Sequence, residues 1–308
     1  MFKTRYWLAG LAISLACAAQ TGTPEGHSAP EVHTQMRNIF YHYTDRIAVR
    51  ISWLDGAVLP THEGAIVVFD DPKSFFISIQ SAKISMGMNA LSETLNDHVF
   101  AAKDAPLKNI EVSAEGQKLK VKGKLHSKDN VPFETESTVS VTPDGKTRIH
   151  AEKVRAAHLP VQGLMDLLGM DISKLIDTRK VQGVSTEGND LILDPDKILP
   201  LPRIRGKLSA VQIAGDQMIL LFGDAKPENS VRAGNFMSYR GGQLRFGKLT
   251  MDKSDMDLID MYKRDPFDFY LDHYREQLSA GYTKITPQFG LRVYMRDYNK
   301  LHSAAGQR

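Results

Sequence analysis

Hydrophobic and polar residues alternate along most of the chain after Asn38, in short runs separated by turn residues about every ten positions. Early examples are RIAVRISWL (Arg46 to Leu54), GAIVVFD (Gly64 to Asp70) and SFFISIQSAKI (Ser74 to Ile84). Because successive side chains of a strand point to opposite faces, this alternation indicates strands with one buried face. The regular spacing of the turns predicts a mainly antiparallel sheet.

Two segments between the strands follow a helical period instead. In the first, apolar residues spaced three, four and four apart fall on one helical face: Met88, Leu91, Leu95 and Val99. In the second, Leu164, Leu167 and Leu168 form one face, and Asp171 can cap a further short helix carrying Ile172, Leu175 and Ile176. We therefore expect amphipathic helices that pack against the sheet.

The pattern changes again at about Met251. Asp265-Pro266-Phe267-Asp268 has the features of a helix start, namely a capping carboxylate, a proline at the first helical position and acid in the first turn. An aromatic stripe follows, and Gly281 can end the helix; its members are Phe267, Tyr270, Leu271, Tyr274 and Leu278. We expect a C-terminal helical extension whose stripe docks against its own domain.

Four lysines alternate with Leu119, Val121, Gly123 and Leu125 in the segment KLKVKGKL; they are Lys118, Lys120, Lys122 and Lys124. A turn at Glu115-Gly116 would pair Val112 with Leu119, and the following hairpin would pair Lys124 with Glu134 and Lys122 with Glu136. Both registers set carboxylates among the lysines. We interpret the lysines as a solvated outer face; a weak attraction for lipid headgroups is the main alternative, and nucleic acid comes last.

Composition limits the class of partner. The chain has 308 residues, 42% of them apolar, which is enough for a sizeable core. The formal charge is +3, and it falls to +1 without Lys3 and Arg5. A dedicated nucleic-acid-binding protein usually shows a basic excess at the domain level, so we expect no nucleic-acid partner.

The first residues, MFKTRYWLAGLAISLACAAQ, resemble a secretory signal: two cations, an apolar run from Tyr6 to Ala19, and small residues suited to cleavage. We expect residues 1–19 to be removed and the product to be periplasmic or secreted. A buried N-terminal helix is the alternative. Cys17 is the only cysteine, and its context is an imperfect lipoprotein signal, so lipid anchoring there is a second alternative.

The sequence contains no familiar catalytic motif. It has no nucleophile elbow, no H-E-x-x-H zinc helix and no glycine-rich phosphate loop, so we expect a protein that is not an enzyme and uses no cofactor. The segment DKSDMDLID lacks the ligand frame of a calcium loop, and we interpret its acids as a solvated surface rather than a metal site. His42, beside two tyrosines, is interpreted as strand or linker decoration.

The order of elements resembles bacterial LmeA-like envelope phospholipid-binding proteins over roughly residues 65 to 223. The resemblance is carried by ISMGMNALSETLND, by PLKNIEVSAEGQKLKVKGKL, by LPVQGLMDLLG and above all by GNDLILDPDKILPLPRIRGKLSAVQIAGDQMILLFG. That family looks related to the TULIP class, in which a curved antiparallel sheet wraps around a long helix and encloses an apolar groove. The resemblance implies acyl-chain binding without catalytic residues, and it does not extend to the region after Met251.

These observations together predict an α+β, mainly antiparallel fold, with a curved sheet around one or two amphipathic helices. We expect a signal peptide (1–19), a linker (20–36), a lipid-binding domain (37–250) and the helical extension (251–308). The expected function is binding or shuttling of phospholipid or another acyl-chain lipid, with peripheral membrane contact as a further partner. The groove residues chosen by amphipathic face are Met88, Leu91, Leu95, Val99, Phe133, Leu164 and Leu168.

A scaffold that docks a protein partner, with a packed core and no groove, is the alternative function. In that case Phe267 and Tyr270 of the aromatic stripe would be contact residues. A hydrolase with scattered catalytic groups is the third.

Overall fold

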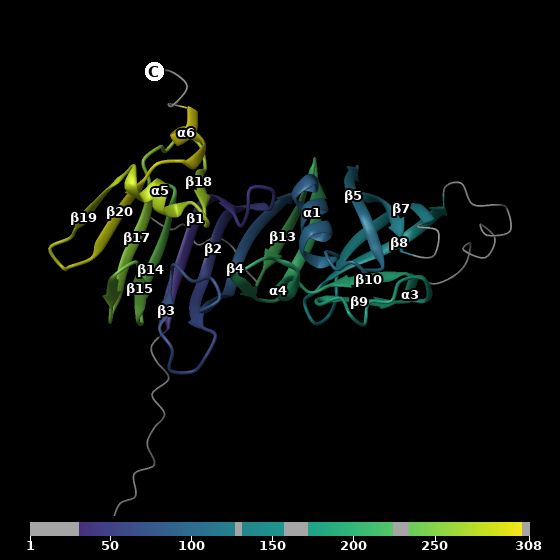
Figure 1. Ribbon diagram of the computed structural model, residues 1–308, viewed down its shortest axis with the longest axis horizontal. Helices are drawn as coiled ribbons and strands as arrows, with labels where there is room; N and C mark the ends of the chain where they lie inside the picture. Colours follow the sequence, from purple (N-terminus) through teal and green to yellow (C-terminus); the bar gives the residue numbers. More distant parts are fainter. Residues whose placement is uncertain (1–30, 127–130, 157–171, 224–233, 304–308) are drawn as a thin grey trace, which may run out of the picture.

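The computed structural model of the protein describes residues 31–126, 131–156, 172–223 and 234–303. Figure 1 shows sheets lying along the long axis, with few helices between them. Most strand pairs are antiparallel, which confirms the predicted mainly antiparallel class.

The largest sheet has eleven strands and forms the left and centre of Figure 1. Nine strands follow one path: β12 (Leu208–Ala214), β13 (Gln217–Phe222), β4 (Phe75–Gly87), β2 (Ala48–Pro60), β1 (Val32–His42), β14 (Phe236–Gly241), β17 (Ser254–Asp260), β20 (Leu291–Met295) and β19 (Tyr282–Ile285). Two more strands pair in parallel off this path: β11 (Arg203–Arg205) on β4, and β18 (Phe267–Tyr270) on β1.

A six-stranded sheet lies at the other end of the molecule, on the right of Figure 1. Its order is β5 (Leu107–Glu115), β6 (Lys118–Leu125), β7 (Val131–Val141), β8 (Thr147–Ala156), β10 (Asp190–Leu193) and β9 (Val184–Glu187). A small third sheet contains β16 (Leu249–Met251), β15 (Leu244–Phe246) and β3 (Val67–Val68).

The helices in the described residues are short. α1 (Met88–Glu93) continues directly into the π-helical turn η1 (Thr94–Val99), which confirms the helix predicted from the spacing of apolar residues. The others are α3 (Ile172–Leu175), α4 (Pro195–Ile198), α5 (Tyr274–Ser279) and α6 (Tyr298–Ser303). The helix expected around Leu164 lies outside the described residues. At α4, Asp194 caps the helix by accepting a hydrogen bond from the Asp196 amide at 3.1 Å.

The predicted helix start at Asp265 is wrong. Residues Phe267–Tyr270 form strand β18 beside β1, and helix α5 begins only at Tyr274. Phe267 and Phe269 are fully buried, so their alternation, rather than the Asp-Pro capping signal, decides the local structure. The described part of the extension from residue 251 onward contains more strand than helix, and β17 joins it to the large sheet through β14. The expected linker also ends early, because β1 begins at Val32.

Phe69 is the centre of an aromatic core on one face of the large sheet. Its ring lies 5.2 Å from that of Phe246, 5.4 Å from that of Tyr274 and 5.8 Å from that of Tyr239, all near edge-to-face. These contacts pack β15, α5 and β14 against one another. Tyr274, expected on a helix stripe that docks against its own domain, is buried in this core, as is Phe269.

The six-stranded sheet is inserted between two strands that pair with each other. The chain leaves the large sheet at the end of β4, builds the second sheet, and returns through α4 to β11, whose Ile204 pairs with Ile77 of β4. Helix α1 starts where β4 ends and contacts β5, so it fills the junction between the two sheets. This arrangement positions the candidate site.

Candidate functional site: an apolar cavity beneath the six-stranded sheet

A cavity of about 60 Å³ lies between the six-stranded sheet and the helices α1, η1 and α3. Among the residues that the structure describes, Thr135 and Ser137 are the only polar ones in its lining. The full lining is Leu91, Leu95, Phe100, Leu107, Ile110, Val112, Leu119, Val121, Phe133, Thr135, Ser137, Ile149, Ala151, Ile172, Ile176 and Leu191. Such a lining favours an apolar occupant, because nothing in it would satisfy a charged group.

Strand alternation builds the wall of this cavity. Leu119 is fully buried and Val121 follows two residues later on the same face, while Lys118, Lys120 and Lys122 point to the other face. Gly123 pairs with Phe133, and a Cβ atom at Gly123 would come within 2.9 Å of the Phe133 ring. The glycine therefore leaves room for the phenyl ring to lie across the strand at the edge of the cavity.

The residues chosen from the sequence fall into three groups. Leu91, Leu95 and Phe133 line the cavity. Met88 is buried in the surrounding core and Val99 is half-buried against it, and neither is among the lining residues. Leu164 and Leu168 lie outside the described residues, as does Cys17. Sequence reasoning missed the contributions of β5 and β8, although the alternation at Val112 and Ile149 signals an inward face.

Polar side chains of α1 and η1 form hydrogen bonds with the backbone at the edge of the six-stranded sheet. Strand β5 is the first strand of its sheet, so one side of its backbone has no neighbouring strand within the described part of the chain. The Asn96 side-chain amide accepts a hydrogen bond from the Ile110 amide at 2.8 Å and donates to the Ile110 carbonyl at 2.7 Å. Ser92 Oγ accepts from the Val112 amide at 2.8 Å. The helix thus closes the edge with side chains while Leu91 and Leu95 face the cavity.

A larger hollow of about 580 Å³ lies outside this helix edge. It is open to solvent, and its lining includes Asn89, Glu93, Asn109, Glu111 and Lys122. Because most of its lining residues are polar and the hollow is open to solvent, it cannot shield an apolar ligand from water. The smaller inner cavity is therefore the better candidate site.

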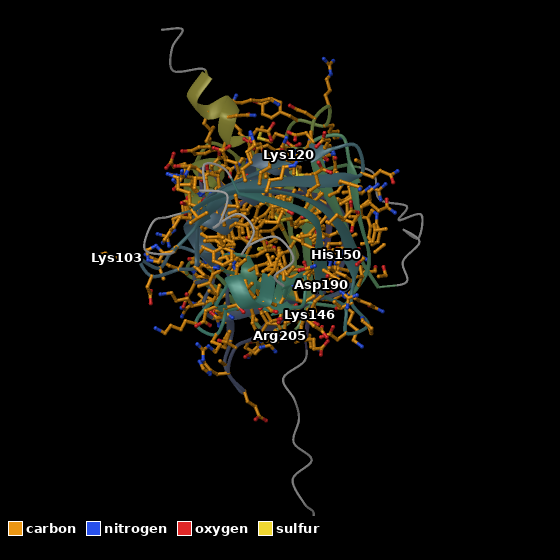
Figure 2. The ribbon with its side chains drawn as sticks, turned by 90° about the vertical axis from the view of Figure 1, so that its right-hand side faces the viewer. Lys103, Lys120, Lys146, His150, Asp190 and Arg205 are labelled. Atoms are coloured by element: carbon orange, nitrogen blue, oxygen red, sulfur yellow. The ribbon has the colours of Figure 1, made fainter. Side chains whose placement is uncertain are left out.

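The lysines of β6 lie on the outer face, as expected, among carboxylates. Lys120 Nζ lies 3.1 Å from Glu134 and Lys122 Nζ lies 3.9 Å from the same side chain, and Lys118 pairs with Glu152. Both predicted registers are wrong by two residues: Val112 pairs with Val121 and Lys122 with Glu134. A shift of two residues keeps every side chain on the predicted face. Figure 2 looks onto this end of the molecule, with Lys120, His150 and Asp190 labelled.

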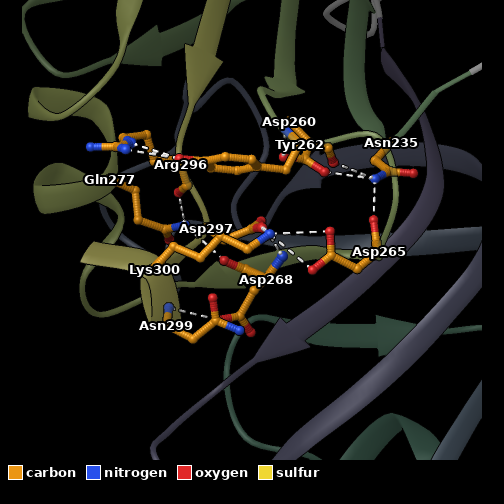
Figure 3. A network of polar contacts seen from close by, with 10 residues as sticks. All are labelled: Asn235, Asp260, Tyr262, Asp265, Asp268, Gln277, Arg296, Asp297, Asn299 and Lys300. Atoms are coloured by element: carbon orange, nitrogen blue, oxygen red, sulfur yellow. Dashed lines mark hydrogen bonds and ion pairs between the residues drawn. The ribbon is translucent and has the colours of Figure 1, made fainter. Parts of the chain in front are cut away.

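A second polar cluster lies at the far end of the large sheet, around α6 (Figure 3). Buried Asp297 accepts from the Asp268 amide at 3.0 Å and pairs with Lys300 at 2.6 Å. Buried Gln277 accepts from the Tyr270 amide and donates to the Asp268 and Arg296 carbonyls. These contacts tie β18, β20, α5 and α6 together, which is a structural role.

His42 belongs to this cluster and is not surface decoration. It is buried in β1, with Nε2 2.7 Å from Asp268 Oδ1 and its ring stacked 3.8 Å from that of Tyr270. Asp268 lies far along the sequence, so no local pattern could have indicated the pair. The packing of β18 beside β1 creates it.

Burial changes the titration of two carboxyl groups here. It raises the pKa of Asp260 to about 6, although hydrogen bonds from Asn235 and the Tyr262 amide favour the charged form. Burial also raises the pKa of Asp297. Burial alone would lower the pKa of Lys300. The hydrogen bonds and ion pairs with Asp297 and Asp265 outweigh this effect, so the pKa of Lys300 is raised.

The interpretation of DKSDMDLID as a solvated surface is wrong for two of its acids. Asp257 and Asp260 are buried within β17. Asp257 pairs with Arg240 of β14 at 2.6 Å and with Arg292 of β20 at 2.9 Å, so the arginines neutralise it. Among the residues that the structure describes, no group of three or more His, Cys, Asp or Glu side chains is placed to hold a metal ion.

Comparisons of the chain with protein-family models, with curated proteins and with solved structures found no match. No helix within the described ranges is both long and apolar enough to span a bilayer. The protein's function is therefore inferred from the residues and the cavity themselves.

Proposed function

We propose that this protein is a non-enzymatic binding protein of the bacterial envelope that holds an acyl-chain lipid beneath the six-stranded sheet, in a TULIP-like manner. The observation that supports the proposal best is the apolar lining of the inner cavity, with fourteen of its sixteen residues carrying no polar side-chain atom. Protein cores are normally packed to the density of organic crystals, so an unfilled apolar space is unusual.

The size of the cavity determines how a chain would enter. About 60 Å³ is less than half of the ~150 Å³ of an apolar cavity known to admit benzene. The lipid would therefore enlarge the space by displacing side chains such as Leu95 and Phe133, or the four-residue helix α3. Each methylene that leaves water contributes about 0.8 kcal/mol, so a chain of several methylenes can offset this rearrangement.

The location of polar groups fits a binding role better than catalysis. Thr135 and Ser137 face the cavity, but the described lining residues include no histidine or carboxylate to activate either hydroxyl. The polar cluster around Asp297 lies at the other end of the molecule (Figures 1 and 3). We accordingly propose binding or transfer of lipid without chemical change.

Two variants on one strand test the proposal. Ser137 is buried and faces the cavity, whereas Ser140 is exposed on the same strand β7. Ser137→Leu should fill the space and lower the affinity for a fluorescent phospholipid at least ten-fold, while Ser140→Leu should leave it unchanged. Circular dichroism and thermal unfolding would establish that both variants fold.

Native mass spectrometry of the chain recovered from an expressing bacterium provides the direct measurement. The expected result is a co-purifying lipid mass that is lost in Ser137→Leu and kept in Ser140→Leu. A folded parent chain that carries no lipid and does not bind the labelled phospholipid would refute the proposal.

A further inference from the structure

One end of the large sheet gathers several chain connections. β1 begins there at Val32, which pairs with Gly241 at the end of β14 and with Val58 near the end of β2. β17 runs antiparallel to β14 and therefore begins at this end, and β20 begins beside it because it is parallel to β17. We call this the β1-start end; it is the lower end of the sheet in Figure 1.

The three most exposed large apolar side chains in the described ranges, Phe289, Ile285 and Leu249, lie at the β1-start end, together with the less exposed Ile66. Phe289 is 90% exposed and Ile285 is 73% exposed, both at the β19–β20 turn. Leu249, at the β15–β16 turn, is 47% exposed, and Ile66, after β2, is 38% exposed. The exposed apolar residues at the opposite end are Phe40, Met261 and Tyr282, none more than 44% exposed. Isolated exposed apolar residues are ordinary, but this concentration is not.

The backbone at Phe289 is in an unfavourable conformation. Its φ is 63°, in the left-handed region, and the other non-glycine residues with positive φ in the described ranges are the asparagines Asn38 and Asn109. Asparagine tolerates this region, whereas a bulky aromatic side chain is disfavoured there. Because the Phe289 ring is exposed, packing within the described chain does not compensate. Such an outlier points to a functional role for the side chain.

The turn that presents Phe289 is well fixed. The Thr286 amide donates to the Gly290 carbonyl at 2.8 Å, the Phe289 amide to the Thr286 carbonyl at 2.9 Å, and the Gly290 amide to Thr286 Oγ1 at 2.9 Å. A Cβ atom at Gly290 would come within 2.1 Å of Asp255, so the turn packs closely against β17. The ring is therefore held outward by a defined turn.

We propose that the β1-start end docks on a lipid bilayer surface, with Phe289 and Ile285 inserted into the interface. The apolar residues lie on three separate connections along one end of the sheet, which suits a plane better than a groove for a peptide. Exposed Lys284 and Lys248 directly precede Ile285 and Leu249, and cations beside apolar anchors are typical of interfacial segments.

The chain preceding β1 supports the same orientation. It enters the fold at the β1-start end and carries the apolar run Tyr6 to Ala19 and Cys17. Only residues 20–30 separate that run from the described chain, and eleven residues extend at most about 40 Å. An N-terminus retained in the membrane or lipidated at Cys17 would hold this end close to the bilayer. The proposal does not depend on lipid occupying the inner cavity.

Tryptophan fluorescence can locate the contact. We compare two variants of the full-length chain: Phe289→Trp and, as a matched control at the opposite end, Phe40→Trp. Each is mixed with vesicles of phosphatidylethanolamine and phosphatidylglycerol, and some of the vesicles contain lipids with brominated acyl chains. We expect a blue shift and quenching for Phe289→Trp relative to the parent chain, and neither for Phe40→Trp. This readout reports the position of the ring even if the N-terminus itself binds the vesicle.

Vesicle sedimentation provides the second measurement. This measurement uses a chain that lacks the N-terminal apolar run, which its mass establishes. In that chain the double variant Ile285→Ser/Phe289→Ser should lower the vesicle partition coefficient at least ten-fold. The double variant Phe40→Ser/Met261→Ser should not lower it. Absence of vesicle binding by the parent, or binding without quenching of Phe289→Trp, would overturn the proposal. Self-association abolished by the Phe289 change, without vesicle binding, would instead identify a second copy as the occupant.

Discussion

The side-chain amide of Asn96 forms two hydrogen bonds with the main chain of Ile110, accepting from its N–H and donating to its carbonyl. One side chain thus takes the place of a neighbouring strand at the edge of the six-stranded sheet. It also fixes α1 and η1 against β5, with Leu91 and Leu95 facing the apolar cavity.

Replacing Asn96 should therefore destabilise the protein. Asn96→Ala leaves two backbone groups of buried Ile110 without their partner, and we expect a loss of about 2 kcal/mol in the free energy of unfolding. Asn89→Ala, at an exposed position of the same helix, should change it by less than about 0.5 kcal/mol. Urea unfolding followed by circular dichroism measures both. Equal effects of the two substitutions would contradict the role given to Asn96.

The two acids that share Arg240 and Arg292 should differ in importance. The Asp257 side chain is 1% exposed and that of Asp255 is 35% exposed. In Asp257→Asn the two arginines face a buried neutral group, and we expect the free energy of unfolding to fall by about 3 kcal/mol. Asp255→Asn should cost about 1 kcal/mol or less. Denaturant titrations of the two variants provide the comparison, and a larger effect of Asp255→Asn would refute this ordering.

Asp260 should make stability depend on pH. Its pKa is raised from 3.8 to about 6 in the folded chain, so between these values the folded state binds more protons than the unfolded state. The contribution of Asp260 to the free energy of unfolding is at most about 3 kcal/mol. It is present in full below about pH 4 and is lost as the pH rises through 6. Asp260→Asn should remove this part of the slope between pH 4 and 7 in urea midpoints.

The control for that experiment is Asp265→Asn. The hydrogen bond from Lys300 lowers the pKa of Asp265, so its contribution has the opposite sign and is lost as the pH falls. This variant should keep the decline in stability from pH 4 to 6. An unchanged slope in Asp260→Asn would show that Asp260 does not titrate in this range.

The lysines of β6 should contribute little. The double variant Lys120→Gln/Lys122→Gln removes partly exposed pairs with Glu134, and we expect a loss of less than about 1 kcal/mol in unfolding free energy. Phospholipid binding by the inner cavity should not change, because the lysines lie on the opposite face of the strand. A ten-fold loss of binding to the labelled phospholipid would instead favour headgroup contact at this face.

The sequence predicts the sheet because alternation is a local signal. It placed the β6 lysines outside and Leu119 inside even though both registers were wrong by two residues, since a two-residue shift preserves the face. It predicted the helix at Met88 from spacing alone. The error at Asp265 arose because a capping signal and the alternation of Phe267 and Phe269 competed, and pairing with β1 favoured the strand.

The sites were harder to predict because distant segments build them. Leu91 and Ile172 meet across the cavity only after four strands have formed between them. His42 and Asp268 come together through the pairing of β1 with β18, and neither carries a local motif. Phe267, expected as a contact residue if the protein were a docking scaffold, is fully buried and cannot make that contact.

The position of β1 affects the order in which the protein can fold. β1 is the first described strand to be synthesised, but its pairing partners on one side are synthesised much later. Met36 pairs with Met237 of β14, and Ile39 pairs with Phe267 of β18. During synthesis one side of β1 therefore stays unpaired until almost the whole chain has emerged, whereas the six-stranded sheet can assemble from its own contiguous segment. A chain interrupted before residue 267 would carry an open strand edge at its centre, ready to pair with another molecule.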